Sequence, residues 1–104
     1  MRAAFFLGLG LLVTACPGTT VLDASTYDQS CTQASDCVLV VSGDVCAVCT
    51  CPNDAINAGS LSAWNTEKSR AEQWCGPRPA VACGPCQAMT TSCVSGACAA
   101  VAQP

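Results

Sequence analysis

The stretch CTQASDCVLVVSGDVCAVCTC, residues 31–51, decides the fold because it joins a short apolar run to a dense set of cysteines. The run VLVV, residues 38–41, is rich in β-branched residues and ends at the turn signal SGD, residues 42–44. It therefore predicts a strand that is buried on both faces. The surrounding cysteines indicate that covalent bridges hold this strand in place.

Ten cysteines lie beyond the first thirty residues, and this even number predicts five disulfides. Such a density is typical of small exported domains, which lack a large apolar core and meet an oxidising compartment. Each bridge contributes about 2–4 kcal/mol, mainly by restricting the unfolded chain. Spacing leaves on the order of 900 pairings open, although Cys49 and Cys51 are expected to have different partners. The ten are Cys31, Cys37, Cys46, Cys49, Cys51, Cys75, Cys83, Cys86, Cys93 and Cys98.

One helix is predicted on the C-terminal side of this stretch. The hydroxyl of Ser60 can cap the free amides of a first turn, and Gly76-Pro77 is a stop signal. Before this helix, PND at residues 52–54 can open a short helical turn over residues 55–57. The face of the main helix is formed by side chains that recur every three or four residues, namely Leu61, Trp64, Lys68, Ala71 and Cys75.

A β-hairpin is predicted near the C-terminal end, where two short extended pieces within residues 92–101 flank Ser95-Gly96. We expect this hairpin to pair with the strand at residues 38–41. The predicted fold class is therefore a small disulfide-rich α+β domain, in which a short antiparallel sheet and one central helix are stapled by about five disulfides.

The first residues have the layout of an export signal. Arg2 precedes an apolar run at residues 3–13, and small residues follow it. This run is shorter than the ~20 residues that a transmembrane helix needs. The sequence therefore predicts a cleaved leader rather than a permanent membrane span.

The end of the leader, VTAC at residues 13–16, resembles the bacterial lipobox. The resemblance implies that the thiol of Cys16 receives a diacylglycerol thioether, that a peptidase cuts just before Cys16, and that the new amine is often acylated. The parity of the cysteines agrees, because assigning Cys16 to lipid leaves an even number. The alternative is an ordinary signal peptide, with Cys16 joining a disulfide.

Three segments are predicted: a lipoprotein signal peptide at residues 1–15, a lipidated N-terminus with a flexible tether at residues 16–30, and a cysteine-rich domain at residues 31–104. The membrane is the expected partner, through the lipid on Cys16, because two or three acyl chains form a lasting anchor. In enteric bacteria an Asp after the cysteine retains lipoproteins at the inner membrane. Pro17 stands there in this chain, so the expected location is the cell envelope, at the outer membrane.

The charge of the chain argues against nucleic acid as a partner. Without the leader, three basic residues remain against seven acidic ones, and the basic residues form no cluster that could grip phosphate. The lipid, rather than electrostatic attraction, must therefore hold the protein at the membrane.

The whole pattern resembles short cysteine-rich lipoproteins of the myxobacterial type. The resemblance rests on DCVLV at residues 36–40, CAVCTC at residues 46–51, a central helix, CGPC at residues 83–86 and a terminal C-x4-C at residues 93–98. It implies the architecture and almost nothing about activity, because the function of most such proteins is unassigned.

The motif Cys83-Gly84-Pro85-Cys86 has the letters of the thioredoxin active site. It suggests an alternative function, a membrane-tethered thiol-disulfide oxidoreductase that uses the Cys83/Cys86 pair. In thioredoxin-like enzymes the motif follows a buried strand and starts a long helix, which lowers the pKa of the first thiol. Here residues 87–92 are too short and too rich in Thr for that helix. We therefore expect two structural half-cystines across a Gly-Pro turn.

Other chemistry is restricted by composition. Four cysteines, Cys46, Cys49, Cys83 and Cys86, have the CxxC…CxxC spacing of a zinc ribbon, but in an oxidising compartment they are expected to pair instead. The chain has no histidine, so it offers no imidazole base and no Ser-His-Asp triad. The Asp residues lie at apparent turns, where Asp normally caps. We expect no catalytic residue, metal site or cofactor.

The two tryptophans are assigned different roles. Trp64 is expected to fill the core. Trp74 either packs on a disulfide or, with Arg78 nearby, anchors a protein partner of unknown identity, since Trp and Arg are enriched at interfaces. The sequence thus predicts a lipid-anchored cell-envelope protein with a non-enzymatic, disulfide-stapled domain in a binding or structural role.

Overall fold

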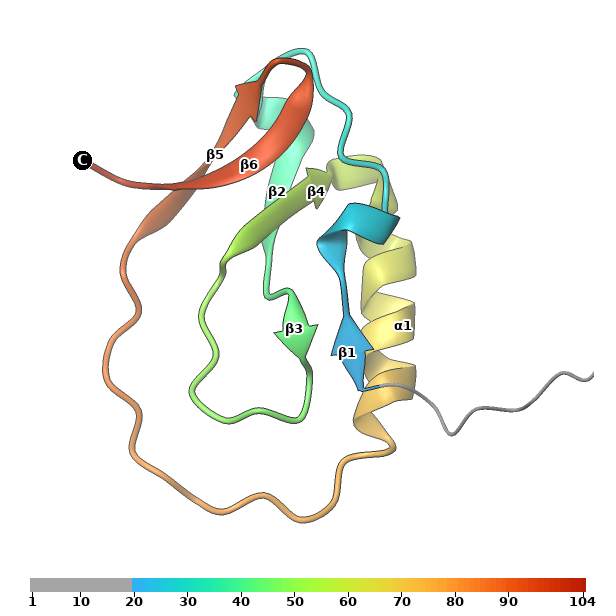
Figure 1. Cartoon of the computed structure of the whole chain (residues 1–104), viewed down its shortest axis with the longest axis vertical. Coiled ribbons are helices and arrows are strands. Elements are labelled where there is room, and N and C mark those ends of the chain that lie inside the picture. Colours follow the sequence, from blue (N-terminus) through green and yellow to red (C-terminus); the bar gives the residue numbers. More distant parts are fainter. Residues whose placement is uncertain (1–19) are drawn as a thin grey trace, which may run out of the picture.

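The computed structural model describes residues 20–104 (Figure 1), so the predicted signal peptide and Cys16 lie outside the described residues. The described chain contains three two-stranded antiparallel sheets, one α-helix and three short 3-10 helices. Five disulfides hold these elements together. The predicted class, a small disulfide-rich α+β domain, is confirmed.

Each of the three sheets consists of two antiparallel strands. Strand β1 pairs with β3, β2 with β4, and β5 with β6. The strands are β1 (Val21–Leu22), β2 (Cys37–Val40), β3 (Gly43–Asp44), β4 (Asp54–Asn57), β5 (Met89–Val94) and β6 (Ala97–Ala102). The helices are η1 (Ala24–Thr26), η2 (Ala34–Asp36), η3 (Ala58–Ser60) and α1 (Leu61–Glu72).

Strand β2 confirms the strand predicted from the VLVV run, but only its two end residues, Cys37 and Val40, are buried. Its partner is β4, in the segment where the sequence suggested a helical turn. That prediction was wrong because Ala55 and Ile56 become fully buried when β4 pairs with β2. A lone helical turn offers no comparable burial, so tertiary packing overrides the local signal.

The C-terminal hairpin is confirmed. Ser95 and Gly96 both have positive φ, at 52° and 80°, as a two-residue hairpin turn of the primed type requires. Its predicted pairing with the VLVV strand is wrong. The amide of Cys98 donates to the carbonyl of Gln29 at 2.7 Å, and the amide of Cys31 donates to the carbonyl of Gly96 at 3.1 Å. The hairpin is therefore hydrogen-bonded to residues 29–31.

Residues 20–30, predicted to be part of a flexible tether, instead belong to the domain. Leu22 and Ala24 are buried in the main core. Further along, the amide of Asn57 donates to the carbonyl of Asp28 at 2.8 Å. The polar composition of this segment concealed its role, because much of what it contributes is backbone hydrogen bonding, which has no side-chain signature.

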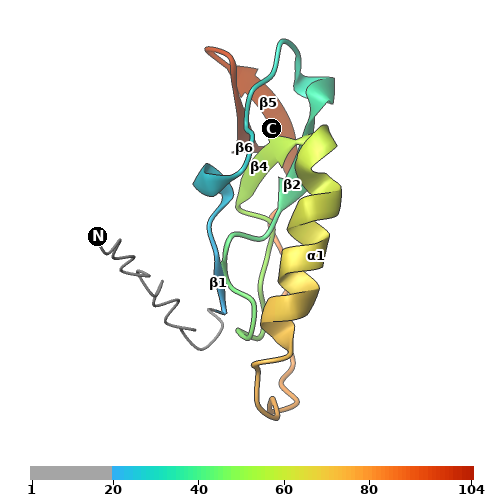
Figure 2. The same ribbon diagram turned by 90° about the vertical axis from the view of Figure 1, so that its right-hand side faces the viewer.

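Helix α1 lies along one side of the sheets (Figure 2) and confirms the predicted helix. Its apolar face contributes Trp64, which is only 2% exposed and meets the ring of Tyr27 edge-on with ring centroids 4.9 Å apart. The predicted side-chain cap at Ser60 is wrong. Asn57 instead accepts a hydrogen bond from the amide of Gly59 and so starts η3, which continues directly into α1.

The described residues form two core clusters. The larger lies between α1 and the sheets and comprises Leu22, Ala24, Val40, Ile56 and Trp64. The smaller is built around the buried disulfide Cys37–Cys98 and includes Ala55. Two such small clusters bury too little apolar surface to stabilise the fold alone, so covalent bridges must add stability.

The turn that leads into β2 is held by a carboxylate, as the sequence suggested for its Asp residues. One oxygen of Asp36 accepts hydrogen bonds from the amides of Thr32 and Gln33, at 2.8 Å and 3.1 Å. These bonds to the charged form lower the pKa of Asp36 below its ordinary value. They fix the short loop between Cys31 and Cys37.

Candidate functional site

All ten cysteines of the described chain are paired, and the predicted count of five disulfides is confirmed. Two bridges, Cys31–Cys93 and Cys37–Cys98, tie the hairpin to the segment that carries η2 and β2. The other three join residues 46–51 to residues 75–86 and are here called the disulfide ladder. They are Cys46–Cys75, Cys49–Cys83 and Cys51–Cys86.

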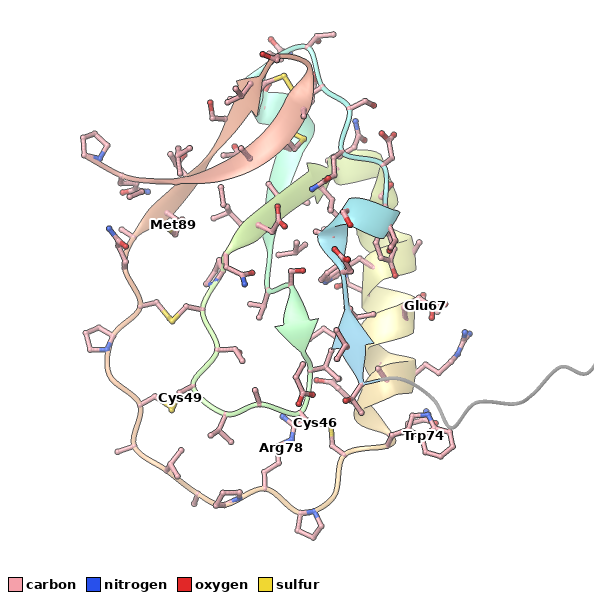
Figure 3. The ribbon with its side chains drawn as sticks, viewed as in Figure 1. Cys46, Cys49, Glu67, Trp74, Arg78 and Met89 are labelled. Atoms are coloured by element: carbon pink, nitrogen blue, oxygen red, sulfur yellow. A yellow bond between two sulfur atoms is a disulfide. The ribbon has the colours of Figure 1, made fainter. Side chains whose placement is uncertain are left out.

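The ladder connects two segments that run side by side in the same direction, since its bridges rise in order along both (Figure 3). The bridged Cα atoms are 5.2–5.6 Å apart. Cys49 has a positive φ of 61°, which is uncommon for a residue other than Gly. The backbone changes direction at this residue, between two neighbouring bridges. Cys49 and Cys51 have different partners, as predicted.

Residues 76–88, here called the ladder loop, are exposed throughout and form no helix or strand. Among residues 20–104, no backbone hydrogen bond joins residues 76–87 to the rest of the fold. Exposed peptide groups in such a segment would normally allow it wide conformational freedom. Here the disulfides at Cys75, Cys83 and Cys86 restrict that freedom.

The ladder loop offers two kinds of contact to a partner. Pro77, Pro79 and Pro85 fix φ and lack an amide donor, whereas residues 80–84 between them keep their amides and carbonyls free for pairing with an added strand. Val81 adds an apolar side chain that is 49% exposed. An extended, pre-ordered segment of this kind can be recognised with little further loss of entropy.

The CGPC motif is part of this loop and does not form its own disulfide. Cys83 is bonded to Cys49, and Cys86 is bonded to Cys51. No helix follows the motif within residues 84–104, where β5 begins at Met89. Both cysteines of the motif are therefore half-cystines, as predicted.

The four cysteines with zinc-ribbon spacing are divided among the three bridges of the ladder. A different group, Cys31, Cys37 and Cys98, has its sulfur atoms within 4.8 Å of one another. Each of these three is also held in a disulfide. A disulfide sulfur is not the thiolate that zinc requires, so in this state the group is two neighbouring bridges rather than a metal centre.

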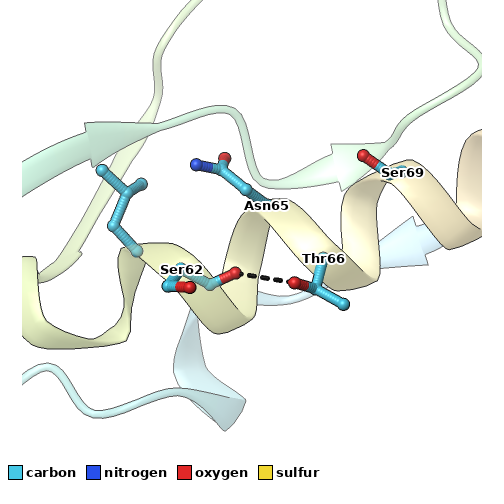
Figure 4. Close-up of a pocket in the computed structure, with 5 residues that line it drawn as sticks. Ser62, Asn65, Thr66 and Ser69 are labelled. Carbon is cyan, nitrogen blue, oxygen red and sulfur yellow. Dashed lines mark hydrogen bonds between the residues drawn. The ribbon is translucent and has the colours of Figure 1, made fainter.

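An open groove lies along the exposed side of α1 (Figure 4) and is lined by Leu61, Ser62, Asn65, Thr66 and Ser69. The hydroxyl of Thr66 donates to the carbonyl of Ser62 at 3.0 Å, so it is already satisfied by the helix. None of the lining side chains carries a charge or titrates near neutral pH. The groove therefore offers hydrogen-bonding groups, and no ionisable side chain lines it.

The two tryptophans differ in burial, as predicted from the sequence. Trp64 fills the main core, whereas Trp74, just after α1, is 57% exposed. Arg78 follows in the ladder loop and is exposed as well. These two residues are the ones that the sequence offers as an anchor for a partner, and both lie at the end of the domain where the ladder loop begins (Figure 3).

The fold and this surface define a small domain that disulfides staple around one exposed loop. A scan against protein-family models, a search of curated proteins and a search of solved structures each found no match to this chain. Within residues 20–104, no helix has the length and apolar character needed to cross a membrane.

Proposed function

We propose that the protein is a lipid-anchored component of the bacterial cell envelope, at the outer membrane, and that it binds a partner protein without acting as an enzyme. The observation that carries the proposal is the ladder loop. Three of the five disulfides hold this exposed segment rather than the core. Bridges in such a position favour recognition, because they fix the shape of a surface.

The cysteine pairing supports lipid on Cys16. The chain has eleven cysteines, and the ten beyond residue 30 are bonded to one another. No cysteine of the domain is left to pair with Cys16, which disfavours the alternative of an ordinary signal peptide with Cys16 in a disulfide. The disulfides themselves favour an oxidising compartment outside the cytoplasm.

The pairing also favours binding over thiol-disulfide exchange. An oxidoreductase of the thioredoxin kind cycles between a dithiol and a disulfide within one CxxC motif. In this protein Cys83 and Cys86 have separate partners on the facing segment. Opening either bridge would release part of the ladder loop instead of resetting an active site.

Mass spectrometry of the protein isolated from its native membrane, alkylated without reductant, tests the anchor and the redox state together. We expect a chain that begins at Cys16 and carries diacylglycerol and an acyl group there. We also expect no alkylation at the other ten cysteines, because all are in disulfides. Two alkylated thiols at Cys83 and Cys86, with turnover of a disulfide substrate, would instead support the oxidoreductase. An unprocessed chain with free thiols would contradict export.

Photocrosslinking tests the binding surface. A photoreactive benzoylphenylalanine in place of Val81 should give a discrete crosslinked adduct with one envelope protein, because Val81 is exposed on the ladder loop. The matched control places the same group at Ala63, which is exposed on α1. The proposal requires that the adduct be absent from the control and be lost when excess unlabelled protein is added. Identical adducts from both positions, or none from Val81, would contradict it.

A further inference from the structure

Trp74 is an exposed aromatic side chain on a fixed backbone. Its amide donates to the carbonyl of Ala71 at 3.0 Å, and the amide of Cys75 donates to the carbonyl of Glu72 at 3.1 Å. The next bond along is the disulfide from Cys75 to Cys46. The chain on both sides of Trp74 is therefore held, and the indole stays 57% exposed.

Trp74 lies at the end of the domain where the described chain begins (Figure 3). Strand β1 starts at Val21 and runs beside α1, so Val21 and the C-terminal end of α1 share this end (Figure 1). Cys16 precedes Val21 by five residues. Even a fully extended chain of that length spans only about 18 Å. A lipid on Cys16 therefore keeps this end of the domain near the membrane surface.

The basic residues of the described chain lie close in the sequence to Trp74. Its three basic residues, Lys68, Arg70 and Arg78, lie in the second half of α1 and the start of the ladder loop, on either side of Trp74. Arg70 pairs with Glu67 at 3.0 Å, whereas Lys68 and Arg78 form no ion pair within residues 20–104.

Four of the seven carboxylates lie on other elements, near η1, η2 and β4. They are Asp23, Asp28, Asp36 and Asp54. Anionic headgroups attract exposed basic side chains and repel carboxylates. The other three carboxylates, Asp44, Glu67 and Glu72, lie on β3 and α1 and balance the three basic residues. This side of the domain therefore has no net charge (3 − 3 = 0), whereas the rest of the described chain carries −4. Anionic headgroups repel the rest of the domain more than they repel the Trp74 end.

We propose that the end of the domain that carries Trp74 and Arg78 docks on the lipid headgroups, with the indole of Trp74 inserted among them. This inference rests on the proposed lipid anchor. Tryptophan suits the headgroup layer because its ring is apolar and its N–H can donate to a polar acceptor. The ladder loop starts two residues after Trp74, so its first residues lie beside the membrane, and the partner of this loop is expected to reach the membrane surface.

Quenching of tryptophan fluorescence by brominated lipids tests the orientation. The mature lipidated protein is reconstituted in vesicles of phosphatidylethanolamine and phosphatidylglycerol, with and without bromine on the acyl chains. We expect about twofold stronger quenching of the wild type than of Trp74→Phe, in which only the buried Trp64 emits. The matched control is the double variant Trp74→Phe, Val94→Trp, because Val94 is similarly exposed, at 53%, on the hairpin. Its quenching should match that of Trp74→Phe.

The outcomes separate the two proposals. Stronger quenching of the wild type than of both variants supports docking through Trp74. Equal quenching of Trp74 and of the indole at position 94, in protein that floats with the vesicles, overturns the docking and leaves the anchor standing. Protein that carries no lipid and does not float with the vesicles overturns the anchor and the docking together.

Discussion

Replacing Cys37 and Cys98 together with alanine is expected to lower the free energy of unfolding by about 3–4 kcal/mol. The bridge Cys31–Cys93 lies beside this one, so the ring that Cys37–Cys98 closes is about a dozen residues long, which corresponds to about 3 kcal/mol of chain entropy. Both sulfur atoms are also in the smaller core, where Cys37 is 7% and Cys98 is 5% exposed. Their loss leaves a cavity, which adds to the cost.

Urea denaturation of the otherwise oxidised protein measures this effect, and the matched control removes Cys51 and Cys86 from the ladder. We expect the control to lose only about 1–2 kcal/mol. In the control the native ladder loop gains freedom together with the unfolded chain, because nothing but disulfides holds it. In the first variant β2–β4 and β5–β6 pairing keeps the native state ordered. Equal losses in the two variants would contradict this account.

Replacing Trp64 with alanine is expected to cost about 3–5 kcal/mol, the usual penalty for removing a large aromatic side chain from a core. The side chain is 2% exposed and supports Tyr27 from α1. The same substitution at Trp74 should change stability by less than about 0.5 kcal/mol, because that indole is mostly in water. The two variants remove the same atoms, so any difference between them reports the environment of each ring.

Thermal unfolding followed by circular dichroism compares the two tryptophan variants under identical oxidising conditions. A loss of stability at Trp74 as large as at Trp64 would mean that the indole of Trp74 is buried in solution. That result would also remove the basis for docking through Trp74, since the inference requires an exposed ring.

Several features of the fold could be predicted from single residues or short patterns. Ser95-Gly96 specified its hairpin turn because few residue pairs accept two positive φ angles. Leu61, Trp64 and Ala71 specified the helix because their spacing matches its period. The even number of cysteines beyond residue 30 predicted five bridges. The turn and the helix depend on neighbouring residues alone, and the number of bridges depends only on the number of cysteines.

The remaining features depend on contacts between distant segments. Ile56 follows a sequence that can start a helix, and only its pairing with Val38 places it in a strand. Gln29 lies in a polar stretch, yet its carbonyl accepts the amide of Cys98 from the far end of the chain. The ladder could not be foreseen because the spacing of cysteines does not reveal which of them meet in space.

The order of the bridges also determines how the molecule responds to proteases. Cys31–Cys93 and Cys37–Cys98 overlap, so every peptide bond between Cys31 and Cys98 lies inside at least one covalent ring. A single cut in the ladder loop, its most accessible segment, opens the backbone but releases no fragment. The nicked protein remains one covalent molecule, and all of it stays joined to whatever holds its N-terminus.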